Sequence, residues 1–135
     1  MKQIVFALLV PLLLVSTVLA TGNAELEKEP FTEERFKELQ EAGEVILVDV
    51  FADWCPTCAR QQEILEQYRQ DHPEKTFHIM EVNFDNNKEW VRHFRAPRQS
   101  TLLLFSGEEQ YWFSVAETDP DVIAAELDKA IAAAN

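Results

Sequence analysis

The sequence predicts a single α/β domain with a central mixed sheet of about four strands and helices on both faces. At 135 residues the chain is long enough for one domain and not for two. Residues 45–51 form a near-continuous apolar run rich in β-branched side chains, which is typical of a strand buried on both faces. A strand–helix–strand pattern begins there and is followed by a hairpin and a helix, an order that indicates a mixed sheet between two helical layers.

The first 24 residues predict a signal peptide. Lys2 precedes an apolar run over residues 4–15, and small side chains follow it at the positions that a signal peptidase prefers. We expect cleavage after Ala20 or Ala24, so that the domain comprises residues 25–135 and is periplasmic or otherwise extracytoplasmic. An uncleaved N-terminal membrane anchor is the alternative, although the run is slightly short for a spanning helix.

The first part of the domain has clear helix signals. Residues 25–30 form a charged lead-in. Thr32 can cap a helix whose first turn holds the acidic residues 33–34, where negative charge favours the helix dipole. Gly43 suits the C-terminal cap of this helix, which comes just before the buried strand.

The remaining elements follow from hydrophobic periodicity. Residues 56–71 have a helical pattern, residues 76–84 alternate as a strand does, and residues 86–94 predict a short helix. Strands are predicted over 101–105 and 110–115, and the turn between them makes an antiparallel hairpin. Asp119 and Pro120 then fit the cap and first residue of an Ala-rich final helix.

Charge and cysteine content narrow the function. The chain has 24 acidic and 12 basic residues and a formal net charge of −12. A field of that sign repels phosphate backbones, so we expect no nucleic-acid partner. Two cysteines are too few for a disulfide-stapled scaffold, which favours a chemical role for the pair.

Cys55 and Cys58 carry the predicted chemistry. Cys55 lies where the buried strand ends and the next helix begins, and free N–H groups at a helix N-terminus stabilise a thiolate. Pro56 fits the first helical turn. Cys58 is one turn further and can attack a mixed disulfide held on Cys55. We therefore expect Cys55 to be the exposed nucleophile and Cys58 the buried resolving thiol, with no cofactor, because the dithiol itself carries two electrons.

The cysteine pair allows other interpretations. Half a zinc site is one, but there is no second Cys-x-x-Cys, and the three histidines fall on different predicted elements, so we expect no metal site. Covalent haem attachment needs a histidine after the second cysteine, where Ala59 stands. A purely structural disulfide remains open, because an exported motif can oxidise and stay oxidised.

These residues resemble the thioredoxin family. Residues 48–58 are similar to its strand and active-site motif, residues 82–85 to the end of its next strand, and residues 101–108 to its hairpin. The resemblance covers about residues 31–135. The Ala-Asp-Trp-Cys stretch is also similar to the periplasmic domain of membrane thiol-electron transporters. The resemblance implies a thioredoxin-like fold, dithiol–disulfide exchange, and a protein partner docking over the cysteines.

Three roles are carried over by this resemblance. Asp49 matches the family's buried acid, which assists proton transfer at Cys58, and a carboxyl beneath a buried thiol has a raised pKa. The alternative is a partly exposed Asp at the strand end. Trp54 matches the tryptophan that shields the nucleophile. Glu81 stands where many thioredoxins have a lysine; a second carboxyl there would raise the proton affinity of the pair, unless it is simply a solvated strand residue.

The loop before residue 101 departs from the family. The resemblance implies a cis-proline at this position, but the residue is Ser100, and the nearest proline is Pro97. A cis bond without proline costs about 3 kcal/mol, so we expect a trans bond and a different substrate groove.

The basic cluster over residues 92–98 is either a solvated helix end or, through Arg95 or Arg98, a patch that flanks Cys55.

Together these observations predict an exported thiol–disulfide oxidoreductase. We expect protein thiols and disulfides as substrates, a membrane-bound redox partner, and a monomer. The Pro56–Thr57 dipeptide between the cysteines is unlike those of strong reductants or oxidants, so the direction of electron flow is left open. A binding module with an inert disulfide, for which Ser100 is the best evidence, and a metal-binding protein that uses both thiolates are the alternatives.

Overall fold

The structure is a computed structural model that describes residues 27–134. The predicted signal peptide over residues 1–24 lies outside the described residues. The elements are, in order, β1 (Lys28–Pro30), α1 (Glu33–Glu41), β2 (Val45–Phe51), α2 (Pro56–Asp71), β3 (His78–Asn83), α3 (Lys88–His93), β4 (Thr101–Ser106), β5 (Glu109–Val115) and α4 (Pro120–Ala134). Within residues 27–134, no helix is both long and apolar enough to span a bilayer.

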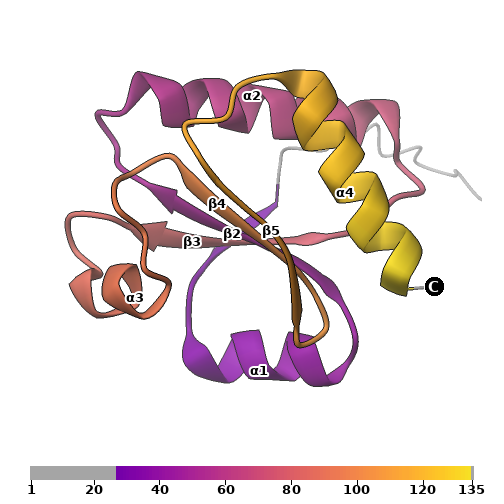
Figure 1. Cartoon of the computed structure of the whole chain (residues 1–135), viewed down its shortest axis with the longest axis horizontal. Coiled ribbons are helices and arrows are strands. Elements are labelled where there is room, and N and C mark those ends of the chain that lie inside the picture. The colour runs from indigo at the N-terminus through magenta and orange to yellow at the C-terminus, as the bar shows by residue number, and fades with distance from the viewer. Residues whose placement is uncertain (1–26, 135) are drawn as a thin grey trace, which may run out of the picture.

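The strands form one mixed sheet of five strands in the order β1-β3-β2-β4-β5. Strand β3 runs parallel to β1 and β2, whereas β4 is antiparallel to both β2 and β5. Helices α2 and α4 cover one face, and α1 and α3 cover the other (Figure 1). The predicted α/β class and two-sided helical cover are confirmed, and β2 lies in the middle of the sheet, as its apolar run requires.

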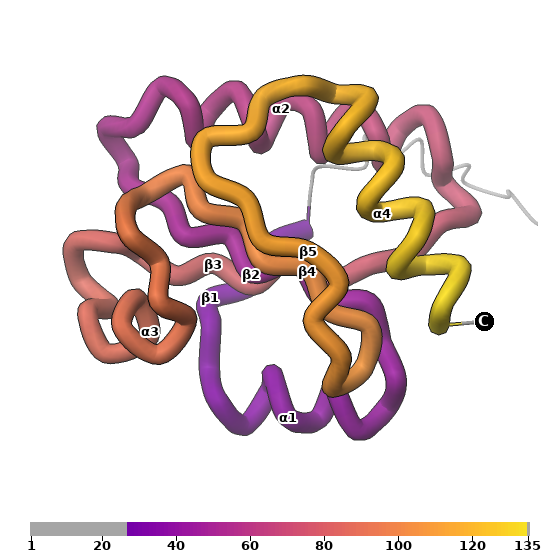
Figure 2. Tube along the Cα trace, in the orientation of Figure 1, coloured from indigo at the N-terminus to yellow at the C-terminus, as the bar shows by residue number. Residues whose placement is uncertain are grey.

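The expected count of about four strands was wrong by one. Residues 28–30, which the sequence predicted to be part of a charged lead-in, form the edge strand β1, and Lys28 pairs with Ile79 of β3. Figure 2 shows this short segment beside β3. Three residues with two charges and a proline carry no alternating pattern. Strand β1 therefore owes its conformation to pairing with β3, and proline is tolerated at such an edge.

Local signals do set the helix ends. The Thr32 side chain accepts a hydrogen bond from the backbone N–H of Arg35 at 3.2 Å, as an N-cap should. Gly43 follows α1 with φ 75°, a conformation that glycine adopts without strain. Strand β3 and helix α3 are each a few residues shorter than their hydrophobic patterns predicted.

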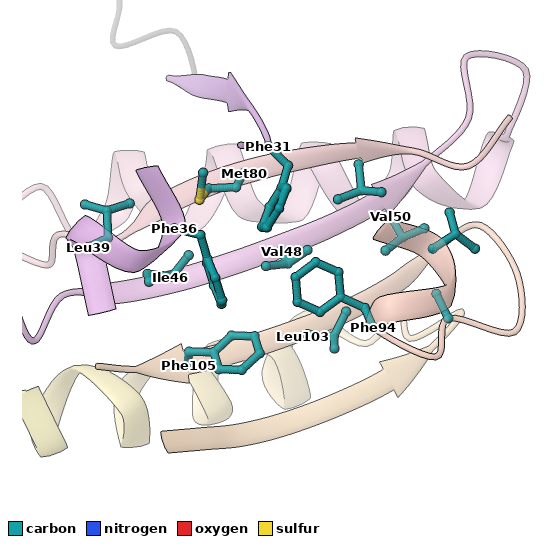
Figure 3. Close-up of a cluster of buried hydrophobic side chains, with 13 residues drawn as sticks. Phe31, Phe36, Leu39, Ile46, Val48, Val50, Met80, Phe94, Leu103 and Phe105 are labelled. Carbon is teal, nitrogen blue, oxygen red and sulfur yellow. The ribbon is translucent and has the colours of Figure 1, made fainter. Parts of the chain in front are cut away.

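Two apolar cores fix β2 between the helical layers. Side chains of alternate β2 residues enter one core with Leu65 of α2 and Leu127 of α4. The opposite core is rich in phenylalanine, and Figure 3 shows Phe31, Phe36 and Phe105 gathered against the sheet. Strand β2, whose carboxyl end leads to the cysteines, is thus held from both sides.

Candidate active site

The cysteine pair lies at the junction of β2 and α2. Cys55 is the N-cap of α2, Pro56 is the first helical residue, and the Sγ of Cys55 accepts a hydrogen bond from the backbone N–H of Cys58 at 3.1 Å. The two cysteines form a disulfide with a Cα–Cα separation of 5.3 Å. A sulfur at this position faces the unpaired N–H groups of the helix, which favour a thiolate when the disulfide is reduced.

The expected exposure of Cys55 was wrong for the oxidised pair. Cys55 is 5% exposed and Cys58 is 2% exposed, so both are buried. The two cysteines pack with Ala52, and Phe51 covers this small cluster. Cys55 is therefore covered in the disulfide-bonded protein, and the motif alone does not show this packing.

Trp54 and the intervening dipeptide form the surface of the site. Trp54 is 62% exposed, and its indole Nε1–H donates a hydrogen bond to Oδ2 of Asp85, just after β3, at 2.8 Å. Pro56 is exposed and Thr57 is half-buried. An apolar ring therefore projects beside the disulfide and is held by a charged acceptor from the neighbouring strand end.

Asp49 lies on β2, six residues before Cys55, and is fully buried. Burial is the main cause that raises the pKa of Asp49 from 3.8 to about 7, and the negative charge of Glu81 acts in the same direction. The hydrogen bond from Gln62 and the charge of Lys28 act to lower this pKa. The alternative of a partly exposed Asp at the strand end is therefore wrong. A carboxyl with such a pKa exchanges its proton near neutral pH.

Glu81 is the residue of β3 that pairs with Asp49 in the sheet. Its carboxylate lies 2.8 Å from the ammonium of Lys28, and the side chains of Lys28 and Glu81 are 27% and 20% exposed. Glu81 is thus neither fully solvated nor alone, and its charge reaches Asp49 across the strand pair.

Ser100 is buried and has φ 59°. All peptide bonds over residues 27–134 are trans, including the bond before Ser100, as expected. The Ser100 carbonyl accepts hydrogen bonds from the N–H of Ala116 at 2.8 Å and from Nε2 of Gln61 at 3.2 Å. The loop before β4 is therefore built on a left-handed residue whose carbonyl is engaged within the domain.

Sequence reasoning missed four polar residues near the site. Gln61 and Gln62 follow Cys58 by three and four positions, so they share its face of α2. Two polar residues on the face of a helix that is expected to be buried could have identified these positions from the sequence. Gln61 is fully buried and also donates to the Glu117 carbonyl at 2.9 Å. Asp85 falls within the stretch that resembles the family but had no predicted role, and Lys28 gave no local signal.

The remaining candidates lie on other elements than the cysteine pair. The basic side chains of residues 92–98 are exposed at the end of α3 and in the loop that follows it. The three histidines, His72, His78 and His93, lie on different parts of the fold. In the part of the chain that the structure describes, no three His, Cys, Asp or Glu side chains are grouped closely enough to hold a metal ion.

Comparisons with known proteins agree with this geometry. The sequence profile of the family named Thioredoxin matches residues 27–129. Thioredoxin from Alicyclobacillus acidocaldarius subsp. acidocaldarius is 30% identical over 76 residues, which are 56% of this chain and 71% of that protein. Thioredoxin from Chlamydia trachomatis serovar D is 27% identical over 88 residues, which are 65% of this chain and 84% of that protein.

Solved structures show the same fold. The crystal structure of Trxlp from Edwardsiella tarda EIB202 matches with a TM-score of 0.69 and 35% identity, over 75% of this chain and 98% of that chain. A mutant thioredoxin from Halobacterium salinarum NRC-1 matches with a TM-score of 0.64 and 21% identity, over 78% of this chain and 91% of that chain, and supports the fold alone. With its cysteine pair at the helix N-terminus, this chain belongs to the thioredoxin family and is a protein disulfide oxidoreductase.

Proposed function

We propose that this protein is an exported oxidoreductase that exchanges disulfides with protein substrates through Cys55 and Cys58. One observation carries the proposal: the Cys55–Cys58 disulfide caps α2, with the Cys55 sulfur on the N–H of Cys58. The helix N-terminus stabilises Cys55 as a thiolate when the pair is reduced, and it makes the same sulfur a good leaving group when the disulfide is attacked. Thiol–disulfide exchange needs both properties.

In the reducing direction, the Cys55 thiolate attacks a substrate disulfide. A bond forms between Cys55 and one substrate sulfur, and the other substrate sulfur leaves as a thiolate. Cys58 then loses its proton to Asp49 and attacks the Cys55 sulfur, which releases the second substrate thiolate and leaves the Cys55–Cys58 disulfide. Two electrons pass to the substrate, and oxidation of a substrate dithiol is the same sequence in reverse.

Export and a membrane-bound redox partner belong to the same proposal. The signal-peptide pattern over residues 1–24 supports export. Each turnover leaves the pair in the wrong redox state for the next, so a second protein must restore it, and outside the cytoplasm a membrane thiol carrier can supply the electrons. We also propose that the protein acts as a monomer on protein thiols and disulfides.

The reduction potential of the Cys55–Cys58 pair tests the function. Trp54 lies beside the disulfide, so its fluorescence can be followed across defined thiol–disulfide buffers, with Trp54→Phe to assign the signal among the three tryptophans. A two-electron transition near about −270 mV indicates a reductant, and one near about −120 to −180 mV an oxidant or isomerase. Cys58→Ala should abolish the transition and trap a mixed disulfide on Cys55.

Two outcomes contradict the proposal. If the unmodified protein shows no reversible redox transition in these buffers, the protein is instead a binding module with an inert disulfide. Stoichiometric metal retained after purification under reducing conditions, lost in Cys55→Ala, would favour a metal-binding protein instead.

A further inference from the structure

A continuous set of polar contacts leads from the buried carboxyl of Asp49 to the edge of the sheet. Nε2 of Gln62 donates to Oδ2 of Asp49 at 3.4 Å. Oε1 of the same Gln62 accepts from the ammonium of Lys28 at 3.2 Å, and that ammonium lies 2.8 Å from Oε1 of Glu81. The four side chains come from β2, α2, β1 and β3 and meet on one face of the sheet.

This set leads from the buried side of α2, the helix that also carries Cys58, to solvent. Gln62 lies one helical turn after Cys58 on the same face of α2. Asp49 is fully buried, whereas the side chains of Lys28 and Glu81 are partly exposed and so reach water. Oδ1 of Asp49 has no hydrogen-bond partner within residues 27–134, which leaves an acceptor for a proton.

Resting on the proposed function above, we propose that Lys28, Gln62 and Glu81 are positioning residues that set the pH at which Asp49 takes up and returns the proton of Cys58. Lys28 and Gln62 favour the carboxylate of Asp49, and Glu81 favours its acid form. The edge strand β1 is then part of the redox machinery, because it supplies the cation.

Opposed charges act on the carboxyl of Asp49. An amide N–H that donates to a carboxylate, or a nearby ammonium, stabilises its charged form, whereas a nearby carboxylate destabilises it. Around Asp49, α2 carries Gln62, β3 carries Glu81, and β1 carries Lys28. The partner of Asp49 on β4 is Leu102, which has no charge. Burial also lowers screening by water, so each contribution is larger than it would be at the surface.

The second step of exchange gives a direct measurement. The reduced protein is mixed with 5,5′-dithiobis(2-nitrobenzoate). Attack by Cys55 releases one thionitrobenzoate and leaves the other bound, and attack by Cys58 on Cys55 releases the second. The rate of this second release is followed by stopped-flow absorbance against pH, and the inflection reports when the Cys58 proton is accepted.

The variants should move this inflection in opposite directions. We expect Glu81→Gln to shift it to lower pH, and Gln62→Leu and Lys28→Met to shift it to higher pH, each by about half a pH unit or more. Lys28→Arg keeps the charge and should restore the unmodified profile. Gln67→Leu and Lys129→Met remove exposed contacts elsewhere on α2 and α4 and should leave it unchanged.

A merely structural role would give a different pattern. Shifts in one common direction, or no shift in an active protein, would overturn the inference. The near-isosteric Glu81→Gln and the charge-conserving Lys28→Arg keep the test decisive if Lys28→Met folds poorly. The carbon-13 titration of the Asp49 carboxyl, assigned with Asp49→Asn, should move with the same signs. If the unmodified protein shows no second release at all, the proposed function fails instead.

Discussion

The indole Nε1–H of Trp54 donates to Oδ2 of Asp85 at 2.8 Å, so the residue next to the cysteine pair is tied to the end of β3. Trp54 is mostly exposed, and little packing holds its ring in place. The orientation of the largest apolar surface beside the disulfide therefore depends on one charged acceptor that is 31 residues away in sequence.

Asp85→Ala should release this ring. We expect the oxidation-linked change in Trp54 fluorescence to shrink, and exchange with a protein disulfide to slow by roughly two- to five-fold, the effect of about 0.5–1 kcal/mol of lost positioning. Asp71→Ala, which removes an exposed carboxylate bonded to Gln67 on α2, is the matched control. Equal effects of the two substitutions would show that the Trp54–Asp85 contact does not position the ring.

Tyr68→Phe should reduce stability without changing redox behaviour. The hydroxyl of Tyr68 donates to Oδ1 of Asp128 at 2.5 Å, which joins α2 to α4, and Lys75 binds the same oxygen at 2.6 Å. We expect a loss of about 1–2 kcal/mol in the free energy of unfolding, measured by urea titration. Tyr111→Phe removes an exposed, longer bond to Glu109 and should cost little. An altered reduction potential in Tyr68→Phe would contradict a purely structural role.

The sequence predicts the features that rest on local signals. Thr32, the apolar run of β2 and the placement of the cysteines at a helix start each depend on neighbours within a few residues, and the structure agrees at each. The burial of Asp49 agrees with what the resemblance to the thioredoxin family implied, and not with the alternative of a partly exposed strand end.

Tertiary contacts decide what the sequence could not. Strand β1 exists because β3 offers it a free edge, and Lys28 becomes part of the site only through that pairing. Gln62 belongs to no recognisable motif, and it contacts Asp49 only because α2 crosses above β2. The burial of Cys55 likewise reflects packing with Ala52, Cys58 and Phe51, which the motif alone does not show.

Ser100 provides a test of the loop before β4. Its φ is 59°, which glycine can adopt without strain and proline cannot, because the proline ring holds φ near −65°. We expect Ser100→Pro to lower the free energy of unfolding by about 3 kcal/mol or more, and Ser100→Gly to stay within about 1 kcal/mol of the original. Denaturant titration measures both.

Ala116 is the matched position for this test, because its φ is 58° and its N–H is bonded to the Ser100 carbonyl. Ala116→Gly should stabilise the fold by about 1 kcal/mol through relief of the left-handed conformation. If Ser100→Pro were as stable as the original, the loop could adopt the family's proline geometry without cost, and the altered groove would not be a fixed property of this chain.

The buried carboxyl of Asp49 should make stability fall as pH rises toward neutrality. Its pKa is about 7 in the folded protein and near 3.8 when exposed, so between these values the folded state holds a proton that the unfolded chain has lost. Since stability decreases with pH wherever the folded state binds more protons, the contribution is intact below about pH 4 and is lost by about pH 7. The loss is on the order of 4 kcal/mol.

Asp49→Asn isolates this contribution, because the amide keeps the shape of the carboxyl and does not titrate. Urea unfolding at a series of pH values measures the free energy of unfolding of both proteins. Relative to the original, the free energy of unfolding of the variant should increase steadily between about pH 4 and pH 7, and the difference should then stay constant. Asp71→Asn, on an exposed part of α2, should track the original throughout. A constant difference between Asp49→Asn and the original would mean that Asp49 is already ionised in the folded protein. A carboxylate that stays ionised down to about pH 4 is a weak base and would take up the proton of Cys58 poorly near neutral pH, so this single titration bears on both the stability of the fold and the chemistry proposed for it.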